Sequence, residues 1–152
     1  MSRVISPPIT YAEWVDLFDM LKQKVDDTEV CAALKQGEIA WQSGVCERFS
    51  KRLIDSVNAR MDAATDKFQK DMYRAKGQDG AIVQALLSLR KEMSFLLNVI
   101  DLPVIPKKDR EHYCALVREQ ADYMQTSLES SARADRSGKM SALVRNNKIN
   151  EI

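Results

Sequence analysis

Apolar residues recur at intervals of three and four along most of the chain, which is the period of amphipathic helices. The first such run is Trp14, Leu17, Phe18, Leu21 and Val25. It predicts a helix over residues 11–25, with Thr10 and Glu13 forming a capping box at its start. A second, short helix is predicted to follow, with Asp27 or Thr28 as its N-cap.

The longest pattern runs without a proline from Ile39 to Lys76. Its apolar positions are Val45, Phe49, Leu53, Val57, Met61, Ala64, Phe68 and Met72. This stripe predicts one helix over about residues 39–76, which would be about 50 Å long at ~1.5 Å per residue. Such a helix would be longer than its partners, which the same spacing argument limits to about 20 residues each.

Two further helices are predicted beyond the break at residues 77–80. The fourth is the most hydrophobic and ends before Pro103, and the fifth begins near Pro106 and fades near Ser130. The stripe of the fourth helix is Ile82, Leu86, Leu89, Met93, Leu96 and Ile100.

Long helices joined by short breaks are antiparallel neighbours, and no segment shows the period of two that a strand requires. The sequence therefore predicts an all-α fold, an up-and-down helical bundle of about five helices with one long central helix. We expect residues 1–130 to form a single helical bundle domain and residues 131–152 to form a basic C-terminal tail.

This tail has too few apolar residues for a core of its own, so we expect it to dock on the bundle or on a partner. The spacing of Met140, Leu143 and Val144 (i, i+3 and i+4) predicts a short helix. This helix would start at Lys139 and be ended by Asn146 and Asn147. The residues predicted to bind a partner are Arg133, Arg136, Lys139, Met140, Leu143, Val144, Arg145, Lys148 and Ile149.

Charge is unevenly distributed although the net charge is only +1. Residues 1–46 hold seven acidic and four basic residues, whereas the tail holds two acidic and five basic residues. The two ends are thus electrostatically complementary. The extra length of the long helix must be exposed or covered by another chain, so homo-oligomerisation is expected.

Few residues are suited to catalysis. His112 is the only histidine, it lies near the start of a predicted helix, and the Glu-x-x-His pairs of helical di-metal sites are lacking. Gly138 and Lys139 lack the preceding glycine and following Ser or Thr of a phosphate-binding loop. We predict a non-enzymatic protein without a cofactor or metal site.

Composition favours an intracellular, cytoplasmic protein. No apolar run approaches the ~20 residues that span a bilayer, so no membrane association is expected. The N-terminal residues lack the hydrophobic block of a secretory signal. Cys31, Cys46 and Cys114 are widely spaced, which favours packing roles over disulfides or a zinc site.

The leading hypothesis is a non-enzymatic helical protein-protein interaction module, namely an adaptor, a chaperone-like protein or an assembly subunit. It would use the bundle faces and the tail to bind a protein partner or another copy. The alternative is a nucleic-acid-associated regulatory or assembly subunit whose basic tail contacts phosphates. Acidic residues interleaved with the bases of the long helix weaken this alternative, because they cancel its positive field.

Overall fold

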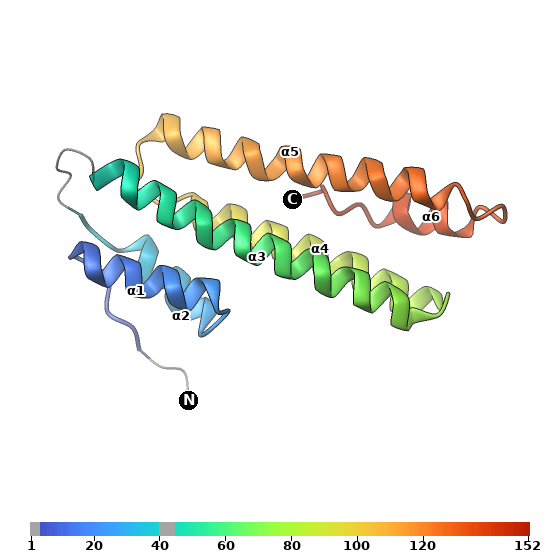
Figure 1. The fold of residues 1–152 in the computed structure, drawn as a ribbon, viewed down its shortest axis with the longest axis horizontal. Coiled ribbons are helices and arrows are strands. Elements are labelled where there is room, and N and C mark those ends of the chain that lie inside the picture. The colour runs from blue at the N-terminus through green and yellow to red at the C-terminus, as the bar shows by residue number, and fades with distance from the viewer. Residues whose placement is uncertain (1–3, 40–44) are drawn as a thin grey trace. The chain divides into compact units, whose positions relative to one another are not determined.

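The computed structural model describes residues 4–39 and 45–152, except for the side chain of Cys46. These residues form an all-α helical bundle without strands, as predicted, and Figure 1 shows its helices. The helices are α1 (Tyr11–Lys22), α2 (Asp27–Lys35), α3 (Val45–Ala75), α4 (Asp79–Ile100), α5 (Lys107–Ala132) and α6 (Lys139–Asn146).

Three helix boundaries differ from the predicted ones. The N-cap of α2 is Asp26 instead of Asp27 or Thr28, because Asp27 is already the first helical residue. The first helix ends at Lys22 instead of near residue 25, because the left-handed backbone of Lys24 and Asp26 (φ 59° and 51°) cannot continue an α-helix. The long helix begins at Val45, and Ile39 precedes it in a non-helical conformation. Residues 40–44, where the sequence also predicted helix, lie outside the described residues.

The chain divides into two compact units. Unit 1 comprises Met1–Met61 and Asn98–Tyr113, and unit 2 comprises Asp62–Leu97 and Cys114–Ile152. The three long helices α3, α4 and α5 each contribute residues to both units. The segment predicted to be a basic tail belongs to unit 2.

The core of unit 1 is an aromatic cluster between α1 and the N-terminal part of α3. Phe49 contacts the rings of Trp14 and Phe18 edge-on, at centroid distances of 4.9 and 5.1 Å. The indole N–H of Trp14 donates to the backbone oxygen of Glu38 at 2.9 Å. Gly37 is required beside this ring, since a Cβ there would lie 2.4 Å from the indole. The capping box predicted at Thr10 starts α1.

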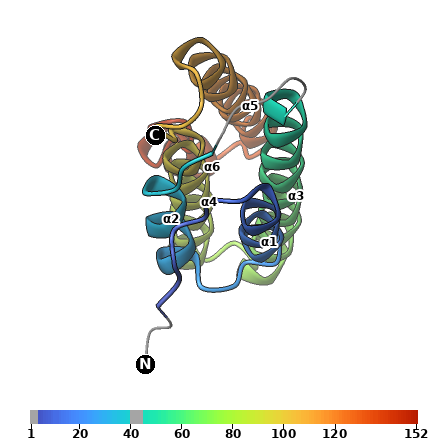
Figure 2. The same cartoon turned by 90° about the vertical axis from the view of Figure 1, so that its left-hand side faces the viewer.

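Polar contacts complete the attachment of α3 to the first two helices. Arg60 is 3% exposed; it donates to the backbone oxygen of Leu21 and, through both Nη atoms, to Asp27 at 2.8 and 2.9 Å. The hydroxyl of Ser56 donates to the backbone oxygen of Phe18. Figure 2 shows α1 lying along this part of α3.

The extra length of α3 is therefore covered within the chain. Phe49, Leu53 and Val57 are buried in unit 1, beside the helices that precede them. A second copy is therefore not needed to cover α3. Homo-oligomerisation stays a prediction, but the length of α3 no longer supports it.

In unit 2, α3 and α4 form a hairpin. Lys76 and Gly77 adopt left-handed conformations (φ 49° and 76°), which end α3 and reverse the chain before α4. The helix α4, predicted to be the most hydrophobic, has more buried apolar residues than any other helix described. No helix among the described residues combines the length and apolarity that crossing a lipid bilayer requires.

Candidate functional site

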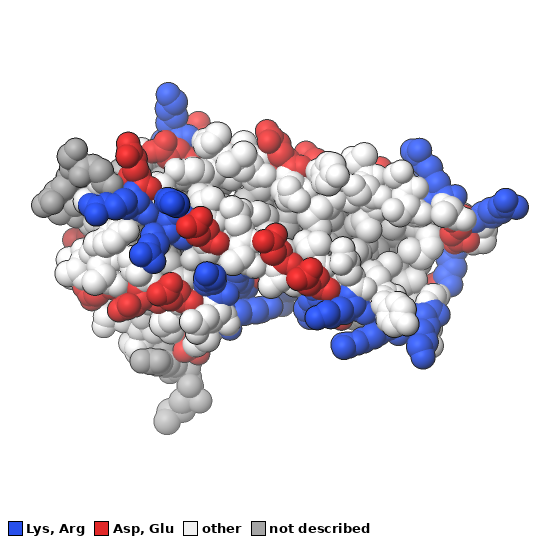
Figure 3. Space-filling model, in the orientation of Figure 1, with Lys and Arg blue, Asp and Glu red and all other residues white. Residues whose placement is uncertain are grey.

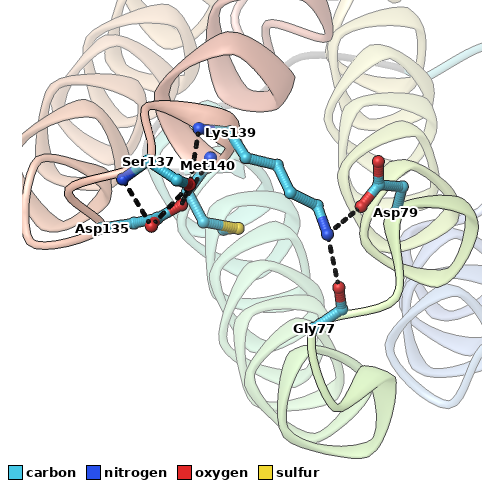
Figure 4. Close-up of polar contacts among 6 residues, drawn as sticks. All are labelled: Gly77, Asp79, Asp135, Ser137, Lys139 and Met140. Carbon is cyan, nitrogen blue, oxygen red and sulfur yellow. Dashed lines mark hydrogen bonds and ion pairs between the residues drawn. The ribbon is translucent and has the colours of Figure 1, made fainter.

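The short helix α6 is held at its N-terminus by one carboxylate, Asp135. Its Oδ2 accepts from the backbone N–H of Met140 at 3.1 Å, and its Oδ1 accepts from the N–H of Ser137 at 3.1 Å (Figure 4). The hydroxyl of Ser137 donates to the same carboxylate. The hydrogen bond from Met140, followed by those from Ser137, lowers the pKa of Asp135, because each favours the charged carboxylate.

The first side chain of α6 connects two turns of unit 2. Lys139 donates to the backbone oxygen of Gly77 at 3.0 Å and forms an ion pair with Asp79 (Figure 4). Gly77 belongs to the α3–α4 turn, and Lys139 follows the α5–α6 loop. Both turns therefore lie at the same end of unit 2.

Gln125 of α5 joins α6 to the residues that follow it. This side chain is 4% exposed; its Nε2 donates to the backbone oxygen of Val144 at 3.3 Å and to Glu129 at 3.0 Å. Its Oε1 accepts from the backbone N–H of Ile149 at 3.0 Å. One side chain thus satisfies backbone groups on both sides of the break that follows α6.

The last residues run back between α4 and α5. From α4, Arg90 donates to the backbone oxygen of Lys148 at 3.4 Å and lies 3.7 Å from the carboxylate of Glu151. From α5, Arg118 donates to the backbone oxygen of Ile152 at 2.8 Å. Asn150 donates to Asp122, also on α5, at 2.9 Å.

The predicted partner-binding residues separate into two groups in this arrangement. Val144 and Ile149 are buried within the chain, and Met140, Leu143 and Lys148 are half-buried. Arg133, Arg136, Lys139 and Arg145 are exposed, although Lys139 is engaged by the α3–α4 turn. The predicted short helix is present as α6, but its apolar anchors are used inside unit 2.

Four exposed cations remain at the end where the two turns meet. Arg74 lies in the last turn of α3, Lys76 follows in the α3–α4 turn, and Arg133 and Arg136 come from the α5–α6 loop. We call these four residues the basic end. Within the part of the chain that the structure describes, none of the four has a hydrogen-bonding or ionic partner of its side chain.

The neighbouring acids do not neutralise the basic end. Residues 74–79 and 133–139 together contain five bases and two acids, a net charge of +3 (5 − 2). Both acids are already engaged: Asp79 is paired with Lys139, and Asp135 caps α6. In Figure 3, Lys and Arg side chains accordingly gather around the α3–α4 turn and the α5–α6 loop.

The chain matches no family model, no curated protein and no solved structure.

An exposed aromatic residue lies beside the basic end. Tyr73 of α3 is 86% exposed, and it lines a surface hollow of about 540 Å³. The other lining residues are Asp66, Gln69, Lys70 and Arg74. All five come from one helix, so the hollow lies along the surface of α3.

Sequence reasoning missed Gln125 and Tyr73. A signal for Gln125 was present, since it continues the four-residue spacing of Val117 and Ala121 with a polar side chain, and buried polar groups need partners. Tyr73 carried a weaker signal: it lies next to Met72 but one position off the apolar stripe.

The residues considered for chemistry are dispersed. His112 is exposed, with its ring 5.7 Å from that of Tyr113. Cys31 is buried and accepts a hydrogen bond from Asn98, and this burial raises the pKa of its thiol. Among the described residues, no group of three or more His, Cys, Asp and Glu side chains could hold a metal ion. The side chain of Cys46 lies outside the described residues.

Proposed function

We propose that this protein is a non-enzymatic helical protein-protein interaction module that acts as an adaptor, a chaperone-like protein or an assembly subunit. The observation that carries the proposal is the basic end. Four exposed cations have no described intramolecular partner, while the two acids beside them are engaged elsewhere. A guanidinium can bind a carboxylate through two parallel hydrogen bonds, which makes arginine a frequent choice for contacts between proteins.

The C-terminal segment supports this proposal in a different way from the one predicted. Its apolar side chains Val144 and Ile149 attach it to unit 2, and Lys139 ties the start of α6 to the α3–α4 turn. These contacts hold the loop that carries Arg133 and Arg136. We infer that the segment presents cations to a partner and is not itself inserted into a groove of that partner.

The alternative, a nucleic-acid-associated subunit, relies on the same cations. Phosphates would bind to them as carboxylates do. However, Asp66 lies on the adjoining surface of α3, and phosphates that followed the cations along this helix would approach its carboxylate. A protein partner is therefore favoured.

Site-specific photocrosslinking in the native cells would test the proposal. A photoreactive phenylalanine analogue replaces Tyr73 in one variant and Tyr123 in another; Tyr123 is the matched control, since it is 70% exposed on α5. We expect the Tyr73 variant to give an adduct of defined mass that survives nuclease and is lost on Arg133→Glu/Arg136→Glu.

Three results would contradict this expectation. No protein adduct from either position would overturn the interaction module. An adduct that nuclease removes would replace it with the nucleic-acid alternative. An adduct that forms equally well from both tyrosines would show non-specific capture and would also overturn the proposal.

A further inference from the structure

The charge of the basic end and the exposed ring of Tyr73 beside it indicate which kind of ligand this surface would bind. We propose that the basic end and Tyr73 together dock an acidic segment of a partner protein, in which carboxylates flank one apolar side chain. This inference rests on the proposed function and specifies its partner by chemistry.

The cations form a site held from two sides. Arg133 and Arg136 lie in a loop whose end is fixed by the Asp135 cap of α6. Arg74 and Lys76 lie at the end of α3, and Lys139 connects this turn to α6 through Gly77 and Asp79 (Figure 4). Because their backbone is fixed before binding, contact with a ligand need order only the side chains and not the two turns that carry them.

The apolar part of the site is Tyr73. Its ring is 86% exposed, and it is followed directly by Arg74 of the basic end. The aliphatic parts of Gln69, Lys70 and Arg74 line the same hollow. An apolar side chain of the partner would remove the tyrosine ring from water, while its neighbouring carboxylates reached the arginines.

The position of Asp66 favours a protein over a nucleic acid. This carboxylate lines the hollow beside Tyr73, whereas Asp71, on the same stretch of α3, is paired with Lys67 at 2.6 Å. A strand of nucleic acid following the cations would bring phosphates near the carboxylate of Asp66. An acidic peptide can place a neutral residue there, because its charges are set residue by residue.

Peptide display on the purified full-length chain tests the inference. A random peptide library is selected on the wild-type protein, and selected peptides are remeasured on Arg133→Glu/Arg136→Glu and on Arg74→Glu/Lys76→Glu. The control is Lys91→Glu/Arg145→Glu, which makes the same change in net charge at exposed positions outside the basic end. Circular dichroism verifies that each variant is folded.

We expect selected peptides rich in Asp and Glu with an aromatic or leucine residue among them. Their affinity should fall about tenfold on either charge reversal, because each removes two exposed ion pairs. It should also fall steeply with salt. Tyr73→Ala should weaken binding several-fold while leaving the salt dependence unchanged, since it removes only the apolar contact.

This inference would be overturned if the selected peptides had no acidic bias. It would also be overturned if acidic peptides bound the charge-reversed and control variants equally well. Neither result would contradict the proposed interaction module. Tighter binding of a single-stranded oligonucleotide that competes with the peptides would overturn it in favour of a phosphate ligand. Failure to enrich any peptide, combined with no adduct in the photocrosslinking experiment, would count against the proposed function itself.

Discussion

Gln125 shows how strongly one buried polar residue can determine the path of a chain. Its amide lies on the side of α5 that would otherwise be apolar, and it pairs with the backbone of Val144 and Ile149. Both of these partners are themselves buried. Leaving a buried N–H or C=O group unpaired costs free energy, so the amide selects one position for the C-terminal segment.

Replacing Gln125 with leucine should therefore release this segment. The variant leaves the Ile149 N–H and the Val144 oxygen unpaired, and we expect the free energy of unfolding to fall by about 2 kcal/mol. Hydrogen exchange should accelerate most at Ile149. Gln120→Leu, an exposed change on the same helix, should alter stability by less than about 0.5 kcal/mol. Unchanged hydrogen-exchange protection at Ile149 would contradict the role of Gln125 in positioning the C-terminal segment.

Arg60 plays a comparable part in unit 1. Its guanidinium is almost fully buried and depends on Asp27 for charge compensation. Asp27→Asn should lower the free energy of unfolding by about 3 kcal/mol, because it removes the negative charge that binds both Nη atoms of this buried cation. Urea unfolding measures the loss, with Asp55→Asn on the exposed side of α3 as the control. Equal losses of stability in Asp27→Asn and Asp55→Asn would disprove the dependence of Arg60 on Asp27.

At the scale of elements, α6 is too short to be stable by itself. It has eight residues, whereas isolated helices need about 12–15 residues to form appreciably in water. Three attachments compensate: the Asp135 cap, the contact of Lys139 with the α3–α4 turn, and the burial of Val144. The element therefore exists because of its surroundings.

The cap makes α6 sensitive to acid. Hydrogen bonds to Asp135 place its pKa in the folded protein below the ordinary value of 3.8. Stabilisation by the carboxylate is thus fully present above pH 3.8 and is lost as the pH falls through the folded-state pKa. We expect the α6 amides to lose protection from hydrogen exchange over that range.

Asp135→Asn should reduce this acid response, because an amide does not titrate there. The variant should start with weaker α6 protection at neutral pH, where asparagine replaces the charged acceptor. An acid response of the same size in both proteins would show that other carboxylates control α6.

At the scale of the molecule, the C-terminal segment contributes to the fold. Removing residues 131–152 should lower the free energy of unfolding by about 3 kcal/mol or more, since Val144 and Ile149 each lose a buried environment. It should also expose the apolar surface they cover. Urea unfolding and binding of a hydrophobic dye measure these two effects.

The control for this truncation is Arg133→Glu/Arg136→Glu in the full-length chain. These side chains are exposed and without described partners, so stability should change little while partner binding weakens. If the truncated chain were as stable as the intact one, residues 131–152 would not have the stabilising role proposed for them.

Much of the fold follows from short-range patterns. The spacing of Leu53 and Val57 predicts the inward face of α3, Thr10 and Glu13 predict the start of α1, and Lys139 is correctly predicted to begin a short helix. Helical period and capping depend on residues within about four positions of one another, so the sequence displays them directly.

The candidate site was only partly visible in this way. The basic residues Arg133 and Arg136 were identified from composition, but Arg74, Lys76 and Tyr73 were not connected with them. That connection depends on Lys139 meeting Gly77 and Asp79, which are about 60 positions away in the chain. The local spacing of residues in the sequence does not predict this long-range contact.

The sequence by itself thus determined the helices, their apolar faces and the excess of charge at each end. The tertiary structure alone decided what each face covers: α1 lies on the N-terminal part of α3, and the anchors of α6 are buried inside unit 2. It also decided which cations were left over, because a side chain is free for a partner only when folding has not already given it one.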